Sequence, residues 1–204
     1  MVHRALAQRL FEAFSIQRWN DHIRPIDLNE MDKAGHRMVS AFLIGKTEEE
    51  RGKAIDWDYI IWGGFFDLLR KVALSDIKAP VHRKIRQLFP EEYRELSRWA
   101  VGQYESMLPE NVYKRFADYV LGDKPTDNHS YRVLRAAHRF SNLRELDYIK
   151  QVNPASSDLT QIERDLSAAL SDYLDLPGVR SLFTRQDLHQ MMLVIERLRY
   201  QIRW

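Results

Sequence analysis

One apolar stretch, Trp57 to Pro80, constrains the fold of this chain more than any other. Residues 57–74 predict a helix, because Asp56 is a suitable N-cap and small or apolar residues recur behind it at helical spacing. The recurring residues are Trp57, Ile61, Gly64, Phe65, Leu68 and Val72, and Ile60, Trp62, Phe66 and Leu69 fill most of the remaining circumference. Such a helix is stable in water only where other helices enclose it, so we expect it at the centre of an all-α fold.

A single carboxylate, Asp67, lies within this apolar helix. Arg70 and Lys71 follow one turn later, and Asp76 comes just past the expected helix end. Because a buried charge is rarely without a partner, we expect Asp67 to bind a cation, a metal ion or a proton. Two interpretations stay open: a metal ligand, or a salt bridge to Arg18, Arg70 or Lys71.

The composition sets broad limits on the function. With 204 residues, the chain is expected to form a single helical domain over residues 1–204, with a helical extension from about residue 158. The absence of cysteine excludes thiol catalysis and thiolate metal sites. A net charge of +2 is too balanced to indicate nucleic acid or a membrane as a partner. No stretch resembles a signal peptide or a membrane span, so a cytoplasmic protein is expected.

Helical periodicity and helix-start signals recur along the chain and predict about eight or nine helices. Asn29 is suited to cap one helix, with Asp32 three residues on, and the prolines 80, 90 and 109 are expected to open three more. A loop over residues 123–130 and a linker over 151–158 separate later helices, and a last apolar stripe runs through residues 188–202. The Gly63-Gly64 pair indicates close helix packing rather than phosphate binding.

The familiar short catalytic motifs are missing: there is no P-loop, dinucleotide glycine fingerprint, HExxH or GxSxG. The remaining candidates are Asp67, His36 and His138, each beside an apolar stripe of a different expected helix. Two imidazoles and one carboxylate would suit a divalent metal ion with open coordination positions for water and substrate. A lone histidine beside an apolar stripe is also commonly a hydrogen-bonded core residue, so both interpretations stay open.

Three local patterns carry a resemblance to a known family. They are Arg18-Trp19 near the N-terminus, His36 in the following helix, and the loop Asp76-Ile77-Lys78-Ala79-Pro80-Val81. In this order they resemble the HD-domain metal-dependent phosphohydrolases, in particular the bacterial 5′-deoxynucleotidase branch, over residues 9–147. The resemblance implies an HD-domain-like helical bundle.

The chain departs from that family pattern at its most characteristic positions. Counting back from Asp76, the His-Asp doublet falls on Asp67-Leu68, and the family's last metal aspartate falls near Ala137-His138. Matching the doublet to Phe66-Asp67 instead needs an extra residue inside a helix, which rotates later positions by about 100°. The acidic residue one turn beyond the doublet is replaced by Lys71. The implied metal set is therefore permuted to His36, Asp67 and His138.

The resemblance implies hydrolysis of a nucleotide or related phosphate monoester with a divalent metal ion (Mn, Co, Zn, Fe, Ni or Mg). In that reading Asp76 acts on the water, Arg18 and Lys71 stabilise charge on the phosphate, and Arg18, Trp19 and Arg70 bind the substrate. A homodimer is expected from the same resemblance. The structural readings are a helix cap for Asp76, packing for Arg18 and Trp19, and a solvated Lys71.

Two other functions stay open. The loss of acidic residues at Leu68 and Lys71 is also typical of a catalytically inactive HD-like module that binds a nucleotide or a protein partner. Basic runs at residues 82–86 and 132–139 suggest a helical nucleic-acid binder, although such runs are usually solvated helix faces.

Overall fold

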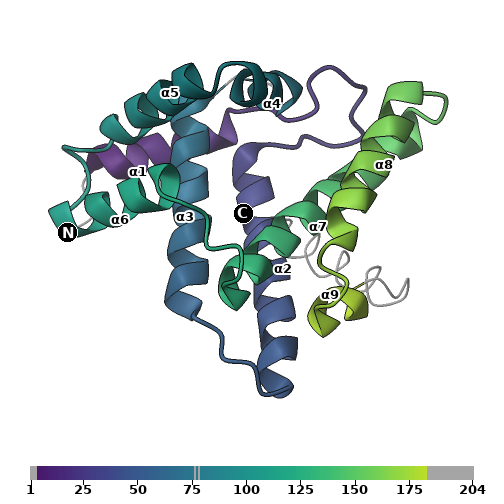
Figure 1. Ribbon diagram of the computed structural model, residues 1–204. Helices are drawn as coiled ribbons and strands as arrows, with labels where there is room; N and C mark the ends of the chain where they lie inside the picture. Colours follow the sequence, from purple (N-terminus) through teal and green to yellow (C-terminus); the bar gives the residue numbers. More distant parts are fainter. Residues whose placement is uncertain (1–3, 76, 78, 183–204) are drawn as a thin grey trace, which may run out of the picture.

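The computed structural model describes residues 4–75, 77 and 79–182, which form helices and loops without a β-strand (Figure 1). The α-helices of this part are α1 (Arg4–Phe11), α2 (Glu30–Glu50), α3 (Trp57–Leu74), α4 (Ala79–Leu88), α5 (Pro90–Gly102), α6 (Glu110–Leu121), α7 (His129–Val152), α8 (Ser157–Ser171) and α9 (Pro177–Ser181). A short 3-10 helix, Glu12–Phe14, continues α1. The all-α expectation is confirmed, while Asp76 and the apolar stripe of residues 188–202 lie outside the described residues.

Helix α3 is central, as its apolar circumference predicts. It packs against α1, α2, α5, α6 and α7. Its side chains enter three separate hydrophobic clusters: Ile60 joins the cluster of α2, α7 and α8, Phe66 joins that of α1, α5 and α6, and Val72 joins a small cluster with Ala13 and Ile16. Figure 1 shows α3 standing between α6 on one side and α2 on the other.

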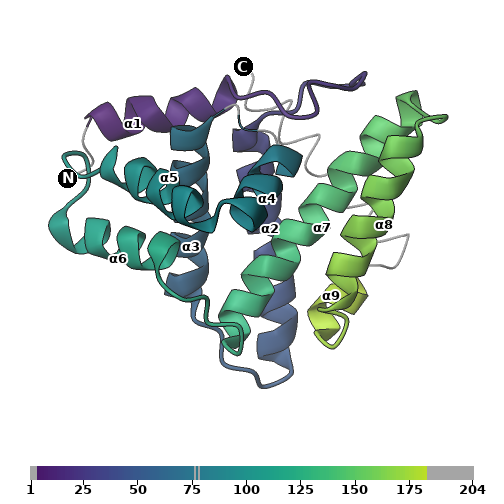
Figure 2. The ribbon, with the colours of Figure 1, turned by 45° about the horizontal axis from the view of Figure 1, so that its top comes forward.

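Helices α2 and α7 share the largest helix–helix interface, and α3 packs against both. Helix α8 runs back along α7 (Figure 2), and α9 packs on α2. Three helices, α2, α3 and α7, therefore meet along one line, and the site described below lies there. None of the helices in the described ranges is both long and apolar enough to cross a membrane.

Local signals fix most helix starts. The Asp56 side chain accepts from the Tyr59 backbone N–H at 2.9 Å, and Asn29 does the same for Asp32 at 2.9 Å. Pro90 is the first residue of α5, as expected. Pro109 is the N-cap of α6 rather than its first residue, and α4 begins one residue before Pro80.

The Gly63-Gly64 pair permits close packing, as predicted. A Cβ on Gly63 would lie 2.7 Å from Leu134 Cδ2 of α7 and 3.0 Å from Tyr119 Cε2 of α6. A Cβ on Gly64 would lie 2.2 Å from Met38 Sδ of α2. Helices α2, α6 and α7 approach α3 this closely because the side chain is absent.

We expect Gly63→Ala to lower the free energy of unfolding by about 1–2 kcal/mol, because overpacking outweighs the gain in helix propensity. Gly35→Ala is the matched control, since Gly35 also lies within a helix and a Cβ there would meet nothing within 4 Å. That variant should gain about 0.5–1 kcal/mol. Denaturant unfolding measures both, and equal stabilisation by the two substitutions would contradict the packing account.

Candidate functional site

The segment between α1 and α2 folds back on itself and places Arg18 at the junction of α2, α3 and α7. The Arg18 N–H donates to Leu28 O at 2.8 Å, the Glu30 N–H donates to Ile16 O at 3.1 Å, and Gln17 forms an antiparallel bridge with Asn29. Next to it, Trp19 adopts a positive φ of 55°. Backbone pairing thus holds residues 16–18 against the start of α2.

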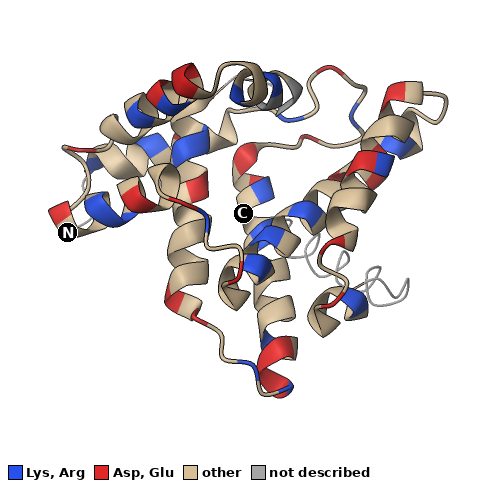
Figure 3. Ribbon diagram, in the orientation of Figure 1, with Lys and Arg blue, Asp and Glu red and all other residues tan. Residues whose placement is uncertain are grey.

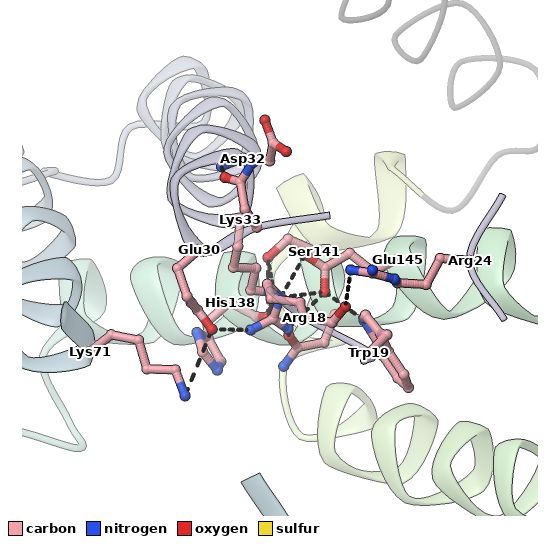
Figure 4. A network of polar contacts seen from close by, with 12 residues as sticks. Arg18, Trp19, Arg24, Glu30, Asp32, Lys33, Lys71, His138, Ser141 and Glu145 are labelled. Carbon is pink, nitrogen blue, oxygen red and sulfur yellow. Dashed lines mark hydrogen bonds and ion pairs between the residues drawn. The ribbon is translucent and has the colours of Figure 1, made fainter. Parts of the chain in front are cut away.

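Arg18 links two buried carboxylates from different helices (Figure 4). Its Nη1 lies 2.7 Å from Glu30 Oε1 of α2, and its Nη2 lies 2.7 Å from Glu145 Oε2 of α7. The Arg18 Nε and the Trp19 indole N–H also donate to Glu145, each at 3.0 Å from Oε2. Burial opposes the charge of Glu145, but Arg18 and Lys33 outweigh burial and lower its pKa. Arg18 is therefore held between carboxylates of two helices.

A second buried cation, Lys33, lies beside this network. Only 4% of the residue is exposed, and its Nζ donates to Ser141 Oγ at 2.6 Å and to the backbone oxygen of His138 at 3.2 Å. Burial lowers the pKa of Lys33 well below its usual value, and the charges of Arg18 and Arg37 lower it further against the opposing effect of the Glu145 and Glu30 carboxylates. The Lys33 amine thus lies on the face of α2 that meets α7, and its charged form is disfavoured there.

His138 is surrounded by positive charge. Its Nδ1 is buried and has no hydrogen-bond partner within the described ranges. Burial lowers its pKa well below the usual value of 6.5, and Lys33, Arg135, Arg37 and Arg139 act in the same direction. The imidazole is therefore neutral, as a metal ligand must be, but a metal ion bound to it would approach several cations.

Asp67 forms a salt bridge with Arg37 of α2, at 2.8 Å between Oδ2 and Nη1. The side chain of Arg37 is 5% exposed and that of Asp67 is 20% exposed. The expected partners were Arg18, Arg70 and Lys71, so the salt-bridge interpretation holds with a different cation. Arg37 lies one turn after Lys33 on the same face of α2, and that face meets α3 as well as α7.

The remaining predicted residues have other neighbours. Lys71 Nζ lies 3.7 Å from Glu30 Oε1. Arg70 donates to the Tyr93 hydroxyl and to Ser97 Oγ at 3.4 Å. His36 is partly exposed, and its backbone oxygen accepts from Ser40 Oγ at 2.8 Å. The catalytic and substrate-binding roles given to Arg18, Trp19, Arg70, Lys71 and Asp76 stay predictions.

The residues at this junction do not fit a metal ion. Over residues 4–75, 77 and 79–182, no group of three or more His, Asp or Glu side chains is arranged to hold one. His36, Asp67 and His138 thus do not form such a group. The physical reason is that Lys33 and Arg37 occupy the α2 face that meets α3 and α7, and the α2 carboxylate Glu30 is paired with Arg18.

A separate cluster of cations lies where α3, α7 and the α6–α7 connection come together: Arg70, Lys124 and Arg135. Desolvation lowers the pKa of Lys124, and the charges of Arg70 and Arg135 lower it further against the opposing effect of Asp67 and Asp123. Among the described side chains, Arg135 has no hydrogen bond or ion pair, and no carboxylate lies within ion-pair distance of the other two. Figure 3 shows Lys and Arg on the upper part of α3 and along α7. We call these three residues the cation cluster.

Comparison with solved structures finds an HD-domain phosphohydrolase from Listeria innocua. The TM-score is 0.67 over 89% of this chain and 84% of that chain, with 15% sequence identity. This chain has the HD-domain fold. No protein-family model matches the sequence, and no curated protein matches it. The likeness establishes the fold, and the 5′-deoxynucleotidase branch stays a prediction.

The sequence did carry a signal for the residues that were missed. Lys33 and Arg37 are spaced four apart next to the apolar residues Ala34 and Met38, and a charged pair at that spacing beside a buried stripe indicates a charged inner face. Glu145 is likewise a charged residue close to an apolar one, Leu143, in the long helix α7. The partners of these three charged residues depend on which helices pack together, and the spacing of residues in the sequence does not reveal that.

We expect Asp67→Asn to lower the free energy of unfolding by about 1–3 kcal/mol, because it leaves the Arg37 guanidinium buried without its carboxylate. The loss should be the same with and without a chelator. Adding Arg37→Met to Asp67→Asn should restore part of it, since the stranded charge is removed. Asp58→Asn, at the exposed ion pair with Arg115, is the control and should cost less than about 0.5 kcal/mol. Equal losses in both single variants would contradict a buried pair.

Stability should fall as the pH drops below 6.5, the usual pKa of histidine. The unfolded chain then protonates His138, whereas the folded chain resists protonation because its pKa is lowered, so acid favours unfolding by up to about 1.4 kcal/mol per pH unit. His82 adds to the same trend, since burial and the nearby charges of Arg70, Lys71 and Arg86 lower its pKa to about 4. Denaturant midpoints between pH 7.5 and 4.5 should fall less steeply in His138→Gln, and an unchanged slope would be the contrary result.

Proposed function

We propose that this protein is an HD-fold module that binds a phosphate-bearing small molecule, such as a nucleotide or another phosphate ester, without a catalytic metal ion. The observation that carries the proposal is the cation cluster: among the described residues, no carboxylate lies within ion-pair distance of Arg70, Lys124 or Arg135. An HD-fold site built in this way attracts anions and repels a divalent cation.

The inner part of the junction is neutralised by its own ion pairs. Arg18 is held by Glu30 and Glu145, and Arg37 by Asp67. These pairs link the N-terminal loop, α2, α3 and α7. They serve as the structural base of the site rather than as its ligand-binding groups.

The cation cluster supplies the ligand-binding groups. Arg135 is free of ion pairs within the described ranges, and a guanidinium suits the paired oxygens of a phosphate. Lys124 lies at the surface near two other positive charges, and its pKa is lowered although Asp67 and Asp123 act in the opposite direction. A phosphate dianion would relieve this repulsion, so binding and protonation of Lys124 favour each other.

A metal-dependent phosphohydrolase is the second candidate. It is favoured by the structural likeness to an HD-domain phosphohydrolase. Against it stand the salt bridge that occupies Asp67 and the absence of a metal-holding group in the part of the chain that the structure describes. Asp76, the predicted water-activating residue, lies outside the described residues. We therefore derive no hydrolytic step for this chain.

Calorimetric titration with inorganic phosphate tests the proposal. Chelator-treated protein should bind phosphate, and Arg135→Met should weaken binding about tenfold or more, because a charge-assisted hydrogen bond contributes about 1.5–3 kcal/mol. Arg98→Met is the matched control, since Arg98 is an exposed arginine of α5 and should leave affinity unchanged. Binding that requires added Mn²⁺, with phosphate released from an ester at the same time, would favour the hydrolase instead.

A further inference from the structure

A pocket of about 280 Å³ opens between α3, α6 and the α6–α7 connection, on the side of α3 that faces the cation cluster. Four aromatic side chains line it: Tyr59, Trp62 and Phe66 from α3, and Tyr119 from α6. Figure 1 shows the α6–α7 connection passing beside α3 on its way to the start of α7. Nothing in the junction described above uses these rings.

The rings form a continuous aromatic wall. Their centroids are 5.4 Å apart for Trp62 and Phe66, 5.7 Å for Phe66 and Tyr119, and 6.2 Å for Tyr59 and Tyr119. Gly63 lies among them without a side chain, so Tyr119 and the α7 side chain Leu134 reach α3 directly. The wall therefore borders α7, and Arg135 is the next residue along that helix.

Positive groups stand over this wall. Arg115 lies 5.1 Å from the Trp62 ring centroid, and Lys124 lies 5.2 Å from that of Tyr119. Lys124 belongs to both the pocket and the cation cluster, so the two are continuous. The charges of Asp67 and Arg135 also act on the hydroxyls of Tyr59 and Tyr119, whose pKa values are raised mainly by burial.

Negative groups fix the direction of a ligand. Asp118 and Asp123 line the pocket and disfavour an anionic group beside them. Lys124 is also part of the lining, and the charges of Arg70 and Arg135 act on it, so an anionic group is favoured at that edge of the pocket. Arg115 is already paired with Asp58. The pocket thus offers aromatic faces and hydrogen-bond acceptors, and the cation cluster offers the anion site.

We propose that the pocket holds the flat aromatic ring of a ligand whose phosphate contacts Lys124 and Arg135. The ligand class is an aromatic phosphate ester, in which the ring stacks on the wall and the ester oxygen spans from pocket to cluster. This inference rests on the proposed phosphate-binding function and adds the second half of the ligand.

Three ligands test phosphate binding and ring binding separately in chelator-treated protein: inorganic phosphate, n-butyl phosphate and 1-naphthyl phosphate. The naphthyl ester should bind at least about fivefold more tightly than the butyl ester, because stacking on an aromatic side chain contributes about 1–3 kcal/mol, or roughly 5- to 150-fold. Trp62→Leu should lose most of that advantage while binding phosphate as before. Trp62→Phe keeps a ring face and should retain most of it.

Each outcome has one meaning. Equal affinity for the butyl and naphthyl esters overturns the aromatic pocket but leaves phosphate binding in place. A naphthyl preference that survives Trp62→Leu, in protein with an unchanged melting temperature, places the ring elsewhere and also overturns the inference. Failure of inorganic phosphate to bind overturns the proposed function itself.

Discussion

The arrangement of this protein depends on how it neutralises charge where α2, α3 and α7 meet. Arg18 joins Glu30 and Glu145 at 2.7 Å each, and Arg37 joins Asp67 at 2.8 Å. Each pair links two segments that are distant in sequence, and each is partly or fully shielded from water. Removing one member of such a pair is costly because its partner stays buried and charged. The ion pairs therefore fix the relative positions of the helices that form the site.

The charges at this junction are unsuited to a divalent metal ion. A divalent metal ion needs several neutral or anionic donors around one point. Here the anions at the junction already face guanidinium groups, and the amine of Lys33 fills space between α2 and α7. Ion pairs between side chains thus hold the three helices together. Arg70, Lys124 and Arg135 have no carboxylate partner among the described residues. This arrangement of charge is the reason for proposing phosphate binding rather than hydrolysis.

Sequence reasoning predicted the parts of this structure that local signals determine. The apolar circumference of residues 57–74 identified the central helix, and Asp56 and Asn29 marked two helix starts through their capping bonds. The glycine pair was correctly interpreted as a packing device. The partner of Asp67 could not be predicted, because Arg37 reaches it only through the register of α2 against α3. For Arg18, substrate binding and packing both stayed open, and the contacts with Glu30 and Glu145 depend on the backbone pairing of residues 16–18 with 28–30, which spacing does not reveal.

The most direct test of a metal-independent HD fold is the melting temperature of chelator-treated protein with and without excess Mn²⁺. A ligand that binds only the folded state raises stability by RT ln(1 + [L]/Kd), so a resident metal site would raise the melting temperature by several degrees. A junction held by side-chain cations predicts no change with Mn²⁺ and a rise with phosphate. A rise with Mn²⁺ that Asp67→Asn abolishes would contradict this account and restore Asp67 as a metal ligand.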